Sequence, residues 1–421
     1  MGSLSGYTGS RCMKKKKVLL HAPILEYPPR GGPEVSVINA IKALNFASDL
    51  YITTSVSKKH HTSTKMVKFL SEHCIDIKYL PSSFVSSQNV TIEKQLTRLK
   101  RVLSPIVALI DVYFINRMSK RYKIKILWID RVLEKAFFVL YFLRKLDRNA
   151  FIVGDTEAVH SRFISRELPM ISNIPRKWFV LLKTQIAKRQ ERSLMCLASS
   201  VTAVSELDAE YFRDISEHKH KVKLFSNTVD ISDFVKGPHK NDQKASQNLL
   251  LMGSFGSPHS PMDRAAKWLT NDIMPIVWKK VPDAHLYIVG KGSKITQSHL
   301  NGSSITVVGE VESISPYLKL ADVCVIPLHY ESGTRFKIIQ AGAASLPCIS
   351  TTLGAEGLKV EDGNQIVIRD TTEDFALAVI DLLVHQRRAL QIGDALGQLV
   401  AKTYGLDVQK SEAIEILSTW G

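Results

Sequence analysis

The sequence predicts an α/β protein with two Rossmann-like domains in tandem, whose parallel sheets face a central cleft. The first observation is length, because 421 residues exceed the roughly 250 to 300 that a single hydrophobic core organises. The second is an alternation of short apolar, β-rich runs with helix-like segments, which is typical of βαβ units and a parallel sheet. The third is a polar segment, 236–248, that separates two such series.

The first series of expected strands supplies an N-terminal domain, residues 1–235. Its runs are 17–22, 50–54, 75–80, 151–154, 201–204 and 222–225. Ahead of them, residues 1–13 are rich in glycine and serine, and we expect a disordered leader there.

The second series supplies a C-terminal domain, residues 236–400. Its runs are 249–252, 285–289, 305–308, 322–326, 348–350 and 365–368, with helical patterns at 262–280 and 372–385. We expect the final segment, 401–421, to form a helix that crosses back to the N-terminal domain. In tandem sheets of this kind, the natural ligand site is the cleft at the carboxyl ends of the strands.

The formal charge of +16 predicts a polyanionic partner. Residues 94–148 contain 14 Lys or Arg and four acidic residues, interleaved with apolar runs such as 136–143. This segment is either a contact with an anionic membrane surface or a core helix with a basic outer face. Nucleic acid is not the expected partner, because neither an RNA-recognition aromatic motif nor a zinc finger is present.

The cysteines and the apolar runs indicate a compartment. The five cysteines are scattered and include no C-x-x-C pair, which indicates a reducing environment and no zinc site. No apolar run reaches the 18 or so residues of a membrane span. We therefore expect a cytoplasmic protein, with any membrane contact on the cytoplasmic face.

Residues 333–347 predict a tight loop, a helix and a stop. Gly333 allows close approach of the backbone, Thr334 is a good N-cap, and Pro347 follows the end of the helix. The first turn of such a helix presents free N–H groups and a positive dipole end. With Arg335 as an added cation, this predicts an anion site suited to a diphosphate.

Two further residues of that helix point to the same site. Lys337 adds a second cation, and Gln340 lies three residues later on the same face. The alternative is an ordinary packed helix with solvated cations.

A glycine-containing loop follows the first expected strand of each domain. Gly31 and Gly32 lie in the first loop, and Gly253 and Ser254 in the second. Neither loop matches the dinucleotide fingerprint or the P-loop. Both place flexible backbone at the carboxyl end of a strand, where a ligand would approach.

An ordered set of motifs in the second half resembles a known family. The motifs lie at 251–254, 288–292, 308–311, 322–328, 333–341 and 351–357. Together they resemble the nucleotide-sugar domain of group 1 (family 4) retaining glycosyltransferases, which have the GT-B fold. The resemblance is specific over about 250–360 and looser in the first half, at 31–32, 155–161, 204–206 and 227–230.

The resemblance implies sugar transfer from a nucleoside-diphosphate donor to a glycan or lipid-linked acceptor, with retention at the anomeric carbon. It also implies no cofactor and no obligatory metal, and the sequence contains no D-x-D motif. Positive charge and fixed donors must then stabilise the leaving diphosphate. The residues assigned to donor binding and diphosphate stabilisation are Gly31, Gly32, Gly253, Ser254, Lys291, Glu310, Gly333, Thr334, Arg335, Lys337 and Gln340.

The sequence departs from the family pattern at three places. Gln340 stands where the family has the glutamate that binds the ribose, and a neutral acceptor bonds more weakly by roughly 1 kcal/mol. Ser332 stands where an acid approaches the sugar, although Glu331 is adjacent. Glu157 stands where the family has a histidine near the sugar, with His160 three residues on.

These departures leave two alternatives open. Glu157 and His160 contact the donor sugar or the acceptor, or they are a surface glutamate and a helix-capping histidine. The whole chain is a glycosyltransferase, or it is a non-catalytic sugar-nucleotide or glycan-binding subunit of a glycan-assembly system.

Overall fold

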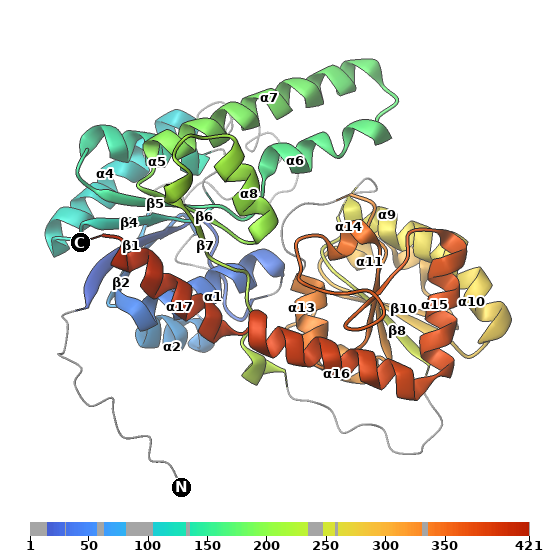
Figure 1. Ribbon diagram of the computed structural model, residues 1–421. Helices are drawn as coiled ribbons and strands as arrows, with labels where there is room; N and C mark the ends of the chain where they lie inside the picture. Colours follow the sequence, from blue (N-terminus) through green and yellow to red (C-terminus); the bar gives the residue numbers. More distant parts are fainter. Residues whose placement is uncertain are drawn as a thin grey trace, which may run out of the picture.

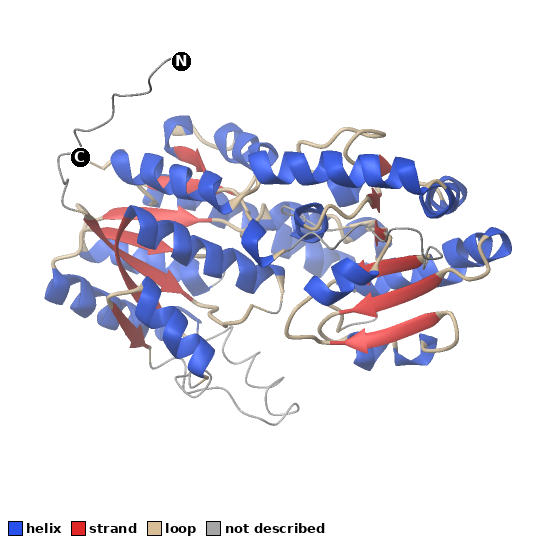
Figure 2. Ribbon diagram, turned by 90° about the horizontal axis from the view of Figure 1, so that it is seen from below, coloured by secondary structure: helices blue, strands red, loops and turns tan. Residues whose placement is uncertain are grey.

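The computed structural model gives two α/β domains that lie side by side (Figure 1). It describes residues 15–29, 31–56, 63–80, 104–131, 135–234, 247–256, 260–330 and 336–420. The expected leader, 1–13, lies outside these residues, as does most of the polar segment at 236–248. In each domain, helices cover the faces of the sheet (Figure 2).

The N-terminal domain contains a seven-stranded parallel sheet in the order β3-β2-β1-β4-β5-β6-β7. The strands are β1 Lys16–Ala22, β2 Ser48–Thr54, β3 Asp76–Tyr79, β4 Ile126–Ile129, β5 Phe151–Asp155, β6 Ser200–Ala203 and β7 Val222–Leu224. Strand order reverses between β1 and β4, so the connections leaving these two strands turn to opposite faces. Such a switch point opens a crevice at the carboxyl ends.

The C-terminal domain repeats this arrangement with six strands, in the order β10-β9-β8-β11-β12-β13. The strands are β8 Asn248–Met252, β9 His285–Val289, β10 Ile305–Gly309, β11 Val323–Ile326, β12 Cys348–Ser350 and β13 Val367–Ile368. Its switch point lies between β8 and β11. The expected strands of both series are therefore present, in two parallel sheets.

The N-terminal helices begin at residues whose side chains satisfy free backbone N–H groups. Ser63, Asn173 and Ser205 cap the helices that follow them. The helices are α1 Gly32–Ala47, α2 Thr64–His73, α4 Ser104–Tyr122, α5 Lys135–Leu146, α6 His160–Ser165, α7 Ile174–Leu197 and α8 Glu206–Asp214.

The C-terminal helices follow the expected pattern, with one irregularity. The helical segment expected at 262–280 is α9, a π-helical stretch at Leu269–Ile273, and α10 in succession. The helices are α9 Pro261–Trp268, α10 Met274–Lys280, α11 Ser293–Thr296, α12 Ser315–Leu320, α13 Phe336–Ala343, α14 Thr352–Ala355, α15 Thr372–Val384, α16 Gln386–Thr403 and α17 Leu406–Ser418.

The last helix, α17, packs on the N-terminal domain beside α1 (Figure 1). Its Ala413, Ile416 and Leu417 belong to the same buried cluster as residues of α1. The crossing is fixed by backbone hydrogen bonds, from Val229 N to Tyr404 O at 2.9 Å and from Leu406 N to Val229 O at 3.1 Å. The helix before it, α16, packs against α13 of the C-terminal domain.

The apolar run at 136–143 is part of a core helix. Within α5, Val139, Leu140 and Leu143 are buried in the cluster beneath the sheet. Of the two alternatives for the basic segment, the core helix therefore describes α5. Among the described residues, no helix combines the length and the hydropathy needed to cross a membrane.

Candidate active site

A cavity of about 440 Å³ lies between the two domains, within the size range of small-molecule sites. It is lined from both domains by connections that leave the carboxyl ends of the strands. The predicted site residues that line it are Gly31, Gly32, Glu157, His160, Gly253, Ser254, Lys337 and Gln340. The structure therefore brings together eight residues from four separate stretches of the sequence.

The N-terminal wall of the cavity includes the start of α1. Gly31 is the N-cap residue, no side chain caps the helix, and proline follows in the first turn. The backbone N–H groups at this end therefore have no capping side chain. They lie at the positive end of the dipole of a 16-residue helix. The loop also lies close to the other domain, since a Cβ on Gly31 would be 3.6 Å from Ser254 Oγ.

The facing wall is formed by the loop after β8 and by α13. A Cβ on Gly253 would lie 2.8 Å from Lys337 Cε, so the lysine side chain runs directly along the glycine backbone. Similarly, a Cβ on Gly32 would lie 3.2 Å from the ring of Phe336. The glycines allow the α13 side chains to approach the backbone of both loops. The two cavity walls thus place the ammonium-bearing side chain of Lys337 near the start of α1.

Gly290 is a residue that the sequence analysis did not assign to the site. Its φ is +138°, and a Cβ there would lie 1.8 Å from the carbonyl oxygen of Gly253. Only glycine fits such a crossing of two backbone segments. Gly290 therefore holds the loop after β9 against the loop after β8, and the Gly-x-Gly pattern at 290–292 is the sequence signal for this contact.

Two predicted donor-binding residues lie elsewhere. Lys291 and Glu310 have exposed side chains on the connections after β9 and β10, and neither is among the residues that line the cavity. Four further predicted residues lie outside the described part of the chain: Glu331, Gly333, Thr334 and Arg335. Their contribution to the site stays a prediction.

Glu157 and His160 both line the cavity, but they do not share a helical face. The helix α6 begins at His160, so Glu157 lies in the connection that follows β5. The two side chains reach the cavity because they follow a strand near the centre of the sheet.

Arg131 positions Glu157, and the sequence analysis missed it. Its Nη1 forms an ion pair with Glu157 Oε2, and its Nη2 donates to the carbonyl oxygen of Pro33 at 2.7 Å. The residue follows β4 and has a φ of +54°, which is unusual for a residue with a side chain. One guanidinium therefore holds both the carboxylate in the cavity wall and the start of α1.

Two buried carboxyl groups lie beneath Arg131. Asp155 accepts a hydrogen bond from Trp128 Nε1 at 2.8 Å and another from Thr202. Asp130 Oδ2 lies 3.6 Å from Arg131 Nε and has no hydrogen-bond partner within the described residues. Burial raises the pKa of both carboxyl groups, although the charge of Arg131 acts in the opposite direction.

We expect the Asp130→Asn variant to gain stability relative to the native protein as pH rises from 5 to 8. A raised native-state pKa means that Asp130 contributes stability at pH values below its unfolded-state pKa of about 4. That contribution is lost as pH rises through the native-state pKa. Thermal unfolding of both proteins across this range measures the difference.

Asp362→Asn is the matched control for this pH dependence. Partial burial raises the pKa of Asp362, but hydrogen bonds from Ile368 N and Arg369 outweigh that effect and lower the pKa overall. Asp362 is therefore ionised throughout the range, and its variant should differ from the native protein by a constant amount. A constant difference for Asp130→Asn as well would contradict the raised pKa.

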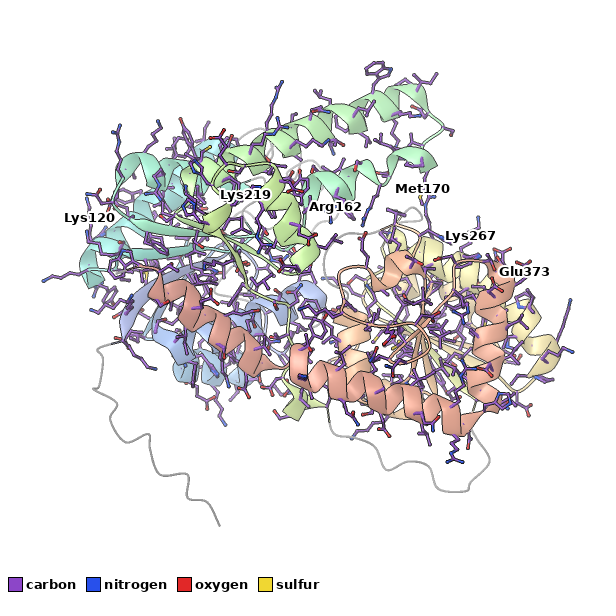
Figure 3. The ribbon with its side chains drawn as sticks, viewed as in Figure 1. Lys120, Arg162, Met170, Lys219, Lys267 and Glu373 are labelled. Carbon is purple, nitrogen blue, oxygen red and sulfur yellow. The ribbon has the colours of Figure 1, made fainter. Side chains whose placement is uncertain are left out.

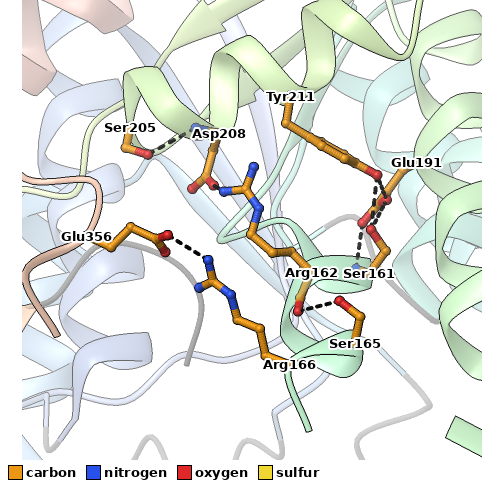
Figure 4. Close-up of polar contacts among 9 residues, drawn as sticks. All are labelled: Ser161, Arg162, Ser165, Arg166, Glu191, Ser205, Asp208, Tyr211 and Glu356. Atoms are coloured by element: carbon orange, nitrogen blue, oxygen red, sulfur yellow. Dashed lines mark hydrogen bonds and ion pairs between the residues drawn. The ribbon is translucent and has the colours of Figure 1, made fainter. Parts of the chain in front are cut away.

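A buried glutamate fixes the start of α6 at the cavity (Figure 4). Glu191 of α7 accepts hydrogen bonds from Ser161 N at 2.9 Å, Ser161 Oγ at 2.7 Å and Tyr211 OH at 2.6 Å. Because Ser161 is adjacent to His160, these bonds hold the histidine backbone in place. The far end of α6 contacts the other domain, where Arg166 pairs with Glu356 at 2.6 Å.

Comparisons with known proteins give a family match and a shared fold. Residues 246–385 match the family model described as Glycosyl transferases group 1. No curated protein matches the chain in sequence.

Solved structures match along nearly the whole chain. Sucrose-phosphate synthase from Thermosynechococcus elongatus is similar with a TM-score of 0.70 and 15% identity, over 96% of this chain and 99% of that chain. HepE from Anabaena, in complex with UDP and glucose, matches with a TM-score of 0.65 and 12% identity, over 96% and 100%. A mutant of TarM from S. aureus, in complex with Fondaparinux, alpha-GlcNAc-glycerol and UDP, matches with a TM-score of 0.65 and 10% identity, over 95% and 99%.

The two tandem parallel sheets and these matches show that the protein has the GT-B fold. Within that fold, residues 246–385 are the part that is similar to group 1 glycosyltransferases. The fold and the resemblance predicted from the motifs at about 250–360 are thereby confirmed.

Proposed function

We propose that the protein is a retaining glycosyltransferase that moves a sugar from a nucleoside-diphosphate donor to a glycan or lipid-linked acceptor in the cytoplasm, without an obligatory metal ion. The observation that carries this proposal is the cavity between the domains. It gathers the amides at the start of α1, Lys337 and Gln340 of α13, and Glu157 with His160. HepE binds UDP-glucose in a structure of the same fold, which supports a nucleotide-sugar donor.

The diphosphate would lie between the start of α1 and Lys337. Negative charge develops on the diphosphate as its bond to the anomeric carbon breaks, and fixed N–H donors and cations stabilise such charge. The acceptor oxygen bonds to the same carbon on the same face, and the departing diphosphate takes up the acceptor proton. Arg335, whose placement is not described, is proposed as the second cation.

The nucleoside and the sugar would occupy the two ends of the cavity. The side-chain amide of Gln340 accepts a hydrogen bond from a ribose hydroxyl, which keeps the nucleoside on α13. Glu157 faces the sugar or the acceptor. Because Arg131 engages Glu157 Oε2, the carboxylate is held in place and acts as a fixed hydrogen-bond acceptor for a hydroxyl.

The test is turnover of UDP-, GDP- and dTDP-sugars by purified protein, with glycan and lipid-linked acceptors and the product's anomeric configuration read by NMR. We expect one donor class to be used, an α-linked sugar donor to give an α-linked product, and chelation by EDTA to leave the rate unchanged. Donor binding without transfer would favour the alternative of a non-catalytic sugar-nucleotide or glycan-binding subunit. An inverted product or complete loss of rate with EDTA would contradict the mechanism.

We expect Gln340→Glu to tighten nucleotide binding about fivefold, because a charged acceptor strengthens a hydrogen bond by roughly 1 kcal/mol. Calorimetric titration with the nucleoside diphosphate of the preferred donor measures the change. Gln386→Glu, at the exposed start of α16, adds the same charge outside the cavity lining and should leave affinity unchanged. Weaker binding by Gln340→Glu would remove Gln340 from the ribose.

A further inference from the structure

The first half of α7 exposes a ridge of large apolar side chains. The helix lies beside α6 (Figure 1). Met170 lies in the connection between the two helices (Figure 3). The exposed fractions of the ridge residues are 68% for Ile174, 70% for Trp178, 57% for Phe179, 60% for Leu182 and 47% for Ile186. Contiguous exposed apolar surface of this kind usually marks an interaction site.

The ridge is separate from the face by which α7 is anchored. Ile174, Trp178, Leu182 and Ile186 recur every four residues and therefore lie along one side of the helix. The opposite side carries the buried positions, among them Val180, Thr184, Ala187, Glu191 and Leu194. The helix thus has one apolar face that packs on its own domain and a second that faces solvent.

The exposed surface of α7 is also strongly basic. Its exposed cations are Arg176, Lys177, Lys183, Lys188, Arg189 and Arg192. The one acidic residue of the helix, Glu191, is buried in the bonds to Ser161 and Tyr211. Lys183 lies over the ring of Phe179 at 4.7 Å. The partner of this surface must therefore accept apolar and aromatic side chains while supplying negative charge.

We infer that the ridge of α7 docks on an anionic membrane surface. Tryptophan, phenylalanine and leucine partition into the region between headgroups and acyl chains, and flanking lysine and arginine side chains pair with anionic headgroups. A second copy of the chain fits poorly, because two α7 ridges would bring their exposed cations together without an exposed acid on either helix.

The geometry connects this surface to the cavity. The helix α7 carries Glu191, which holds Ser161 next to His160 in the cavity wall. A membrane bound at the ridge would therefore hold the helix that anchors α6, whose His160 lines the cavity. The inference stands on α7 itself and does not depend on the proposed reaction, because vesicle binding and sugar transfer are measured separately.

The test is flotation of the full-length protein with vesicles of phosphatidylcholine alone or mixed with phosphatidylglycerol. We expect binding to the mixed vesicles, weakened by salt, and little binding to phosphatidylcholine alone. The double variant Trp178→Glu/Leu182→Glu should lose about tenfold or more in vesicle affinity. Leu377→Glu, on an exposed position of α15, is the matched control and should bind as the native protein does.

Two further variants test the contribution of the basic side chains and the insertion of Trp178 into the bilayer, and a third variant is the control for charge. Lys183→Glu/Lys188→Glu should weaken binding to the mixed vesicles by about tenfold, whereas Lys279→Glu/Lys280→Glu at exposed positions of α10 should not. Trp178→Phe should keep binding but lose the blue shift of tryptophan emission that vesicles cause in the native protein.

Three outcomes would overturn the inference. The first is failure of the native protein to bind the mixed vesicles. The second is equal binding to both kinds of vesicle, which would show that the charge of α7 plays no part. The third is a dimer, formed without vesicles and dissociated by Trp178→Glu/Leu182→Glu, which would assign the ridge to a second copy. Circular dichroism of each variant establishes that it is folded.

Discussion

Replacing Lys337 by alanine is expected to lower the transfer rate by about 10² to 10³-fold, or roughly 3 to 4 kcal/mol in activation free energy. The side chain passes Gly253 and lines the cavity opposite the start of α1. There its ammonium group can meet the charge that develops on a leaving diphosphate. Because this charge is larger in the transition state than in the bound donor, kcat should fall more than affinity. Steady-state kinetics with the preferred donor measures both.

Two control variants separate this role from a general loss of charge. Lys402→Ala, at an exposed position near the end of α16, removes the same charge outside the cavity lining and should keep the native rate. Lys337→Arg retains a cation at the cavity and should recover part of the rate. An unchanged kcat for Lys337→Ala, with normal thermal stability, would remove the lysine from the leaving-group site.

The fold was predictable because local patterns determine most of it. The expected strands at 17–22 and 249–252 begin the two sheets, and the remaining runs follow in the expected alternation with helices. Parallel strands buried on both faces produce short apolar runs that stand out in any sequence. The resemblance of 250–360 to group 1 glycosyltransferases added the GT-B fold, whereas the strand order was not predicted, because it depends on tertiary pairing.

The site was predictable only where a residue belongs to a recognisable motif. Gly31, Gly253 and Lys337 lie in such motifs, and the structure places all three at one cavity. Arg131 belongs to no motif. Its partners Glu157 and Pro33 are distant from it in sequence, so no local pattern indicates the contacts. Those residues meet because β1, β4 and β5 are neighbours in the sheet. Pairing across a sheet is a tertiary property, so sequence spacing did not reveal it.

Exposure was the property that sequence pattern predicted least well. The apolar run at 136–143 indicated a membrane contact or a core helix, and Val139 and Leu140 are buried. No sequence pattern predicted that Trp178 and Leu182 are exposed, yet both are. A helix that carries apolar residues on two opposite faces does not show in its sequence which face the rest of the protein covers.

Removing the guanidinium of Arg131 is expected to reduce both stability and activity, and the two effects have separable causes. In Arg131→Met, the buried Asp130 loses its neighbouring cation. Loss of one partner of a buried pair costs about 3 to 5 kcal/mol, and we expect about 3 because the raised pKa lets Asp130 take up a proton instead. Chemical denaturation measures this loss. Transfer should slow independently, since Glu157 and the start of α1 lose the side chain that holds both.

A second substitution distinguishes the two causes. In Arg131→Met/Asp130→Asn, no buried carboxylate is left at position 130, so most of the lost stability should return. The contacts with Glu157 and Pro33 O remain absent, so the transfer rate should stay low. Glu157→Gln provides the complementary case, with near-native stability and reduced transfer. If the double variant recovered its rate along with its stability, Arg131 would serve only to neutralise Asp130, and the carboxylate in the cavity wall would be positioned without it.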